Sequence, residues 1–403
     1  MKKIHVVQLM LFLLTFILTT ISGAELRYGK SLFNGGGLDL VEIYGGLVYS
    51  LLFLTFLTFH EFGHYFTALK NNVKVTLPFY IPMYLGFLGL PSIGSMGAFI
   101  SIRERVKSRR AFFDIGVAGP LAGFVVAVII MIVGFLTLPS LDYIFEIHPE
   151  YIPFGENYRE YKPDVGETAM VFKFGSNLLF HLAETYLNYD TSLYPYANEV
   201  LHYPFLMVAY IALFFTAINL LPIGQLDGGH IIYGLFGKKM HGIISRVCYI
   251  AFMFYAGLGF IRPDSFDFSF IAWSFGYIYF LYVCLFNVHT DRQARLMIAV
   301  IIYTAQFMLL YFVPSLEGYP GWLLMGLIVG RVTGIDHPET ENQAPLDLKR
   351  KIVGFLSIIV FVVSFSPRPF VFEQVKGPER AKEQSSVNII EVKKTEDSDF
   401  TAL

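Results

Sequence analysis

Five residues at the end of an apolar segment, His60-Glu61-Phe62-Gly63-His64, have the types and spacing of a metal-dependent hydrolase. Histidines four positions apart share one face of a helix, so both imidazoles can bind the same metal ion. A glutamate beside the first ligand can then polarise a metal-bound water. The alternative is a polar cluster that only caps the helix at the membrane surface. Ionisable residues are costly in lipid and usually functional there, which favours the metal interpretation.

Two histidines do not complete a catalytic zinc site, which usually has three protein ligands and a water. The best third ligand is Asp227, in the segment Asn-Leu-Leu-Pro-Ile-Gly-Gln-Leu-Asp-Gly-Gly that begins at Asn219. Pro222 and the glycines interrupt the preceding helix, and a broken helix at membrane depth can direct a carboxylate into a bundle. On its local pattern alone, Asp227 would be an N-cap of the next helix. The upstream histidine pair favours a metal ligand instead.

The composition predicts that these residues lie in a membrane. The chain has 403 residues, 55% hydrophobic and 15% charged, whereas soluble domains average about 25% charged residues. Several apolar runs reach the roughly 20 residues of a spanning helix. We therefore expect an all-α polytopic membrane protein of roughly 7–8 transmembrane helices. No basic domain indicates nucleic acid, and Cys248 and Cys284 lie in apolar runs that indicate neither a disulfide nor a cysteine metal site.

The chain divides into four predicted regions. Residues 1–24 fit either a signal peptide or a signal anchor. Residues 43–235 form the expected core, with a Gly/Pro-rich re-entrant hairpin at 77–102 and an external loop at 139–200. Residues 236–370 supply additional helices, and residues 371–403 form a polar tail with little to bury, which predicts disorder. The predicted spans lie at about 43–69, 111–138, 203–221, 243–262, 268–287, 296–313 and 351–366, with a short apolar piece at 321–330.

Charge predicts the orientation of the bundle. Basic residues cluster at 103–110 and recur at 238–239 and 292–295, whereas the 139–200 loop holds ten acidic residues against three basic ones. By the positive-inside rule the basic ends face the cytoplasm. Both candidate metal motifs then lie near the cytoplasmic ends of their helices. We expect a multi-pass protein of a bacterial inner membrane, with the side of the C-terminal tail unplaced.

The two motifs together resemble the signatures of the site-2 protease family, HExxH and N-x-x-P-x-x-x-L-D-G. Gly94-Ser-Met-Gly97 and Gly119-Pro-Leu-Ala-Gly123 are also similar to family segments, and the resemblance covers about residues 45–235. It implies a three-helix catalytic core and one Zn²⁺ per chain held by His60, His64 and Asp227. It also implies Glu61 as the catalytic acid/base, assisted by Asn219, and a single-span membrane protein as the substrate.

Other functions remain open from the sequence. A transporter or channel with a structural metal site fits the broken helices, but it leaves HExxH unexplained. A histidine-box oxygenase needs many clustered histidines, and a peptidase with a glutamate as third ligand lacks a suitable glutamate. His230 is expected in an interfacial role and His337 in a turn. The 139–200 loop is too short for the peptide-binding module of many bacterial members, so substrate identity, regulation and oligomeric state stay open.

Overall fold

The computed structural model describes residues 3–33, 37–161, 168–187, 193–262 and 268–376. Within these residues the chain is mostly helical, as predicted, and adds four short strands. The elements up to the second metal motif are α1 (Lys3–Tyr28), α2 (Leu40–Gly45), α3 (Leu47–Lys70), β1 (Phe79–Pro82), β2 (Ser95–Phe99), α4 (Arg109–Leu136), α5 (Asp142–Ile147), β3 (Thr168–Phe174), α6 (Leu178–Leu187) and α7 (Pro204–Asn219). The remaining elements are α8 (Asp227–Gly257), α9 (Phe268–Cys284), α10 (Arg292–Phe312), α11 (Gly321–Ile328), α12 (Leu348–Ser364) and β4 (Phe370–Lys376).

In the part of the chain that the structure describes, five helical segments are long and apolar enough to cross a bilayer: α1, α2 with α3, α4, α9 and α10. α7 and α11 are shorter apolar helices. Large apolar side chains also cover the outer faces, where Leu51, Val125, Ile129 and Ile301 are each more than half exposed. A helix satisfies its own backbone hydrogen bonds, so such faces suit lipid. The chain is therefore an integral membrane protein; the number of crossings stays a prediction.

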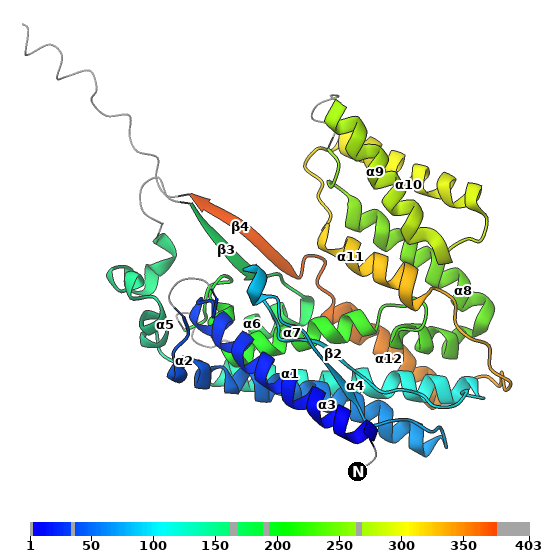
Figure 1. Cartoon of the computed structure of the whole chain (residues 1–403), viewed down its shortest axis with the longest axis horizontal. Coiled ribbons are helices and arrows are strands. Elements are labelled where there is room, and N and C mark those ends of the chain that lie inside the picture. Colours follow the sequence, from blue (N-terminus) through cyan, green and yellow to red (C-terminus); the bar gives the residue numbers. More distant parts are fainter. Residues whose placement is uncertain (1–2, 34–36, 162–167, 188–192, 263–267, 377–403) are drawn as a thin grey trace, which may run out of the picture.

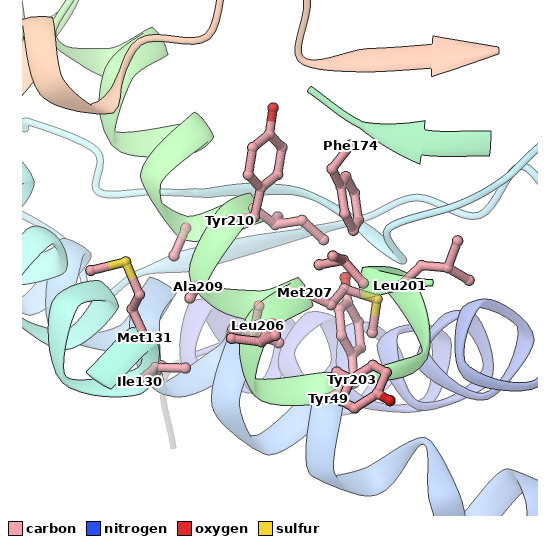
Figure 2. Close-up of a cluster of buried hydrophobic side chains, with 14 of the residues drawn as sticks. Tyr49, Ile130, Met131, Phe174, Leu201, Tyr203, Leu206, Met207, Ala209 and Tyr210 are labelled. Atoms are coloured by element: carbon pink, nitrogen blue, oxygen red, sulfur yellow. The ribbon is translucent and has the colours of Figure 1, made fainter. Parts of the chain in front are cut away.

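The helices form two packed groups (Figure 1). In the first, α3, α4 and α7 bury one large apolar cluster, and α1 packs along α3. Figure 2 shows Leu206 and Met207 of α7 beside Ile130 of α4 and Tyr49 of α3. In the second group, α8, α9, α10 and α11 surround a separate cluster. The first group holds α3, α4 and α7 of the predicted core, but α12, which was predicted among the additional helices, also packs on α4 and α7. The division of the chain at residue 235 stays a prediction.

The Gly/Pro-rich stretch forms a short antiparallel hairpin. β1 pairs with β2, with Phe79 opposite Phe99 and Tyr80 opposite Ala98. Gly94 has a φ of +86°, and a side chain there would meet the α1 backbone at Thr19, 2.5 Å away. Only glycine accepts both the left-handed conformation and this approach. The hairpin therefore packs directly on the backbone of α1, and the two segments form one structural unit.

The start of the predicted tail is ordered, which corrects the boundary at residue 371. Residues 370–376 form β4, which pairs in antiparallel register with β3 of the 139–200 loop. The pairing places the described end of the chain beside that loop (Figure 1). α12 begins at the opposite end, where Arg350 bonds both carboxylate oxygens of Asp114 at 2.7 and 2.8 Å. Residues 377–403 of the predicted tail lie outside the described part of the chain.

Candidate metal centre

The HExxH residues lie within the last three turns of α3, on the side that packs against α4. His60, Glu61 and His64 are buried, with 3%, 4% and 7% of their surface exposed. The four-residue spacing places both imidazoles on one face, and their Nε2 atoms are 3.2 Å apart. Burying ionisable groups is costly unless they are paired or bind a metal. The sequence-predicted pair is therefore brought together inside the bundle, not at its surface.

The turn between α7 and α8 delivers the carboxylate. α7 ends at Asn219, three residues before Pro222, and α8 begins at Asp227. The turn is held at Gly224, whose N–H donates to the Ser245 hydroxyl and whose carbonyl accepts from His241 Nε2, at 2.9 and 3.1 Å. Asp227 is the first helical residue, and not the N-cap that its local pattern alone favoured. Its side chain is free to face α3.

The three predicted ligands have the spacing of a metal site. Asp227 Oδ2 is 3.5 Å from His60 Nε2 and 3.3 Å from His64 Nε2, and the two nitrogens are 3.2 Å apart. A tetrahedral zinc ion with ligand atoms at about 2.0–2.1 Å separates them by about 3.3 Å. The three atoms lie within 4.8 Å of one another and offer two neutral-nitrogen donors and one carboxylate, a set that suits zinc.

A hydrogen bond orients the second histidine. His64 Nδ1 donates to the Ile115 carbonyl of α4 at 2.7 Å. That bond fixes the tautomer, so the Nε2 atom carries the lone pair that a metal needs. The Nδ1 atom of His60 is buried and has no hydrogen-bond partner among the described residues. The two imidazoles are therefore not equivalent: one is held by α4, the other by packing.

A cavity of about 260 Å³ opens over the three ligands. Glu61 lines it together with Ile100, the residue that follows β2. Asn219 also lines it, with its Nδ2 atom 3.4 Å from His60 Nε2. Glu61, Asn219 and the β1–β2 hairpin therefore line the same cavity. The structure brings together all five residues that the sequence analysis selected, and their roles stay predictions.

Close packing of α4 on the metal motif depends on a glycine whose role the sequence analysis did not identify. A Cβ atom at Gly119 would lie 2.1 Å from His64 Nε2. Real Cβ atoms do not approach so closely, so any larger residue would displace the ring. The glycine motif was recognised only through family resemblance. No spacing rule within α4 alone could have indicated that it faces a ligand of another helix.

His337, which was expected in a turn, lies buried in the irregular segment that follows Gly334. It is 5% exposed, its ring stacks on Tyr233 at 3.9 Å, and its Nε2 atom is 2.8 Å from His230 Nδ1. His337 Nδ1 donates to the Pro338 carbonyl, so Nε2 accepts from His230. Neither histidine belongs to a metal-binding group within the described residues. The pair fastens the 334–347 segment to α8 near the cavity.

The fold and the site together define a class: a helical membrane protein with a buried HExxH motif and an aspartate placed where the three side chains could hold a metal ion. Comparison with known proteins agrees. A profile of peptidase family M50 matches residues 48–260, just over half of the chain. The chain belongs to peptidase family M50, the site-2 protease family.

Curated relatives are described as probable zinc metalloproteases. The EGY1 protein of Oryza sativa subsp. japonica, named as chloroplastic, is 31% identical over 180 residues, covering 45% of this chain and 26% of its own length. EGY1 of Arabidopsis thaliana is 30% identical over 186 residues, covering 46% and 29%. EGY2 of Oryza sativa subsp. indica is 27% identical over 210 residues, covering 51% and 31%. The chain thus spans less than a third of the length of these relatives. No solved structure matches it significantly.

Proposed function

We propose that the protein is a site-2-type zinc metalloendopeptidase that cuts a peptide bond within or near the transmembrane segment of a single-span membrane protein. The observation that carries the proposal is the spacing of three ligand atoms, 3.2–3.5 Å apart, beside the Glu61 carboxyl group. His60, His64 and Asp227 would hold one zinc ion per chain. Family membership and the names of the relatives support the same chemistry.

The residues predicted to act in the cavity have separate proposed tasks. A zinc ion with three protein ligands acts as a Lewis acid and brings the pKa of water toward about 7. Glu61 accepts the proton of the attacking water and gives it to the leaving nitrogen. Asn219, close to His60, can donate a hydrogen bond to the oxygen that gains charge. His64 is held in its ligand tautomer by the Ile115 carbonyl.

The substrate must reach this cavity as an extended strand. An α-helix hides its carbonyls in hydrogen bonds to residue i+4, so the target has to unwind first. β2 lines the cavity through Ala98 and Phe99, and among the described strands it pairs on one edge only, with β1. A peptide added to its other edge would replace the lost helical hydrogen bonds. We therefore propose the hairpin as the element that holds the unwound substrate.

The predicted regions gain support from packing. α1 contacts α3 through the Thr19–Ser50 hydrogen bond of 2.6 Å, and Gln8 Nε2 donates to the Leu77 carbonyl. We propose that residues 1–24 act as an anchor in the folded protein, with 43–235 as the catalytic core. We also propose that the active site faces the cytoplasm. A bacterial inner membrane stays a prediction without support from the relatives, whose names place them in chloroplasts.

Two variants separate metal binding from chemistry. Asp227→Ala should lose zinc and activity together, because it removes one of three ligands. Glu61→Gln should keep zinc but slow cleavage by about 10²- to 10⁴-fold, because an amide cannot accept the water proton.

The measurements are zinc per chain by mass spectrometry and cleavage of a co-reconstituted single-span protein with glycines in its apolar segment. Substantial turnover by Glu61→Gln would remove this residue from the reaction. A wild-type protein that holds zinc but cuts no single-span protein would favour the transporter or channel with a structural metal site.

A further inference from the structure

A second group of metal-binding side chains lies at the other end of the bundle, in the 139–203 region. His148 follows α5, and Glu199 and His202 precede α7. Their ligand atoms also lie within 4.8 Å of one another. None of the three belongs to the HExxH and aspartate motifs, and the proposed peptidase reaction does not use them. The cluster is separate from the catalytic cavity, whose lining includes none of them.

The distances in this cluster match those of the catalytic site. The Nε2 atoms of His148 and His202 are 3.2 Å apart. Glu199 Oε2 is 3.2 Å from His202 Nε2 and 3.7 Å from His148 Nε2. These separations are close to the about 3.3 Å between ligands of a tetrahedral zinc ion. Two imidazoles and one carboxylate form a recurrent zinc ligand set.

The outer hydrogen bonds orient both imidazoles toward the shared point. His202 Nδ1 donates to the Arg27 carbonyl at the end of α1, and His148 Nδ1 lies 2.8 Å from Glu150 Oε1. With both protons on Nδ1, the two facing Nε2 atoms carry lone pairs. Carbonyl and carboxylate partners of this kind are typical of histidines that bind metals. Two lone pairs at 3.2 Å repel unless a cation lies between them.

Hydrogen bonds also orient the Glu199 carboxylate toward the two imidazoles. It is 2% exposed, and its Oε1 atom accepts from the Tyr151 hydroxyl at 2.9 Å and from the Asn198 amide. Its Oε2 atom has no hydrogen-bond partner among the described residues and faces the two imidazoles. A buried carboxylate oxygen in this position calls for a cation.

We propose that His148, Glu199 and His202 form a second site for a divalent transition metal of the zinc class, on the side of the membrane opposite to the basic residues. A cavity of about 390 Å³ borders all three side chains, so a fourth coordination position is open to water or a ligand. The ion would link the segment after α5 to the start of α7. α7 carries Asn219 at its other end, so the site would fix the helix that lines the catalytic cavity.

The test is metal stoichiometry of the full-length protein in detergent, stripped with chelator and re-equilibrated with buffered Zn²⁺. His148→Ala is the main variant, because its side chain is 25% exposed and its loss should leave the fold intact. We expect it to hold one zinc per chain fewer than wild type. His181→Ala, an exposed histidine of α6 in the same region, is the matched control and should hold the wild-type number. Glu199→Gln, which keeps the shape and the tyrosine hydrogen bond, should lose the same ion as His148→Ala.

Cobalt substitution gives an independent readout, because tetrahedral Co²⁺ absorbs in the visible range. His148→Ala should remove one component of the spectrum, and should do so in the Asp227→Ala background as well. That background separates this proposal from the proposed peptidase, since either site can fail alone. Equal metal content in wild type and a folded His148→Ala protein would overturn the second site. The cluster would then be a hydrogen-bonded group that shares a proton.

Discussion

At the scale of single residues, the candidate zinc ligands could be predicted to lie together because helical spacing places two of them on one face. His60 and His64 share a helix face wherever that helix lies. Asp227 followed from the break after Pro222 and from the need for a third ligand. The hydrogen bond from His64 to the Ile115 carbonyl could not be predicted, because it joins two helices whose relative rotation is set by packing.

Gly119→Ala tests how strongly α4 constrains this site. The added methyl group would lie 2.1 Å from His64 Nε2, and the ring cannot turn away without losing its bond to Ile115. We expect zinc affinity to fall by about 10- to 100-fold, as when a residue supporting a ligand is changed. Competition with a chelator of known affinity measures this loss.

The matched control is Gly276→Ala on α9, where nothing lies within 4 Å of the new methyl group. This change should leave zinc affinity unaltered and helix stability slightly higher, by up to about 1 kcal/mol. An unchanged affinity in Gly119→Ala would mean that α3 and α4 separate easily. The close approach of the two helices would then not be needed for metal binding.

At the scale of elements, the apolar spans were predictable from composition, but the sheet of β3 and β4 was not. Its partners are about 200 residues apart, with Phe174 opposite Phe370, and no local pattern indicates such pairing. The polar residues after 371 favoured a tail, because a lone strand has little to bury. Pairing with β3 supplies backbone hydrogen-bond partners, and contact with α7 supplies an apolar surface for the strand to pack on.

Phe370→Ala should show what the β4 contact contributes. The Phe370 ring packs on Phe214 of α7 at 4.9 Å and on Phe172 and Phe174 of β3 at 5.9 and 6.1 Å. We expect a loss of about 2 kcal/mol of stability, below the value for a fully buried phenylalanine because the ring is half-buried. Thermal unfolding in detergent, followed by circular dichroism, measures the change.

Phe372→Ala is the control within the same strand. Its side chain is 56% exposed, and its ring packs on Phe172 of β3 at 5.1 Å. The destabilisation should be clearly smaller, within about 0.5–1 kcal/mol. Equal losses for both variants would indicate that β4 contributes through its backbone alone, and that docking on α7 adds nothing.

At the scale of the whole molecule, the basic cluster and the acidic loop lie at opposite ends of the bundle, as the predicted orientation requires. The basic 103–110 cluster holds the 334–347 segment: Arg105 and Arg110 donate to the carbonyls of Glu339 and Pro345 at 3.0 Å. α12 starts at that end and leads to β4, which pairs with β3 in the acidic loop. The sequence could not place the last helix because the 321–330 piece was too short to assign. The pairing of the two strands removes that ambiguity.

Cysteine labelling in intact cells tests this topology as a whole. The background replaces Cys248 and Cys284, and single cysteines replace Lys74 and Lys239 at the basic end, or Tyr186 and Phe372 at the other end. All four positions are exposed, so reactivity should report the side of the membrane and not burial. Because basic ends face the cytoplasm, positions 74 and 239 should react with a membrane-impermeant reagent only after permeabilisation. Positions 186 and 372 should react from outside.

The reverse pattern would overturn the orientation and leave the metal chemistry untouched. Labelling of 186 and 372 from opposite sides would instead contradict the β3–β4 pairing. Position 186 lies in α6, which follows β3 and has 10 residues, too few to cross a bilayer.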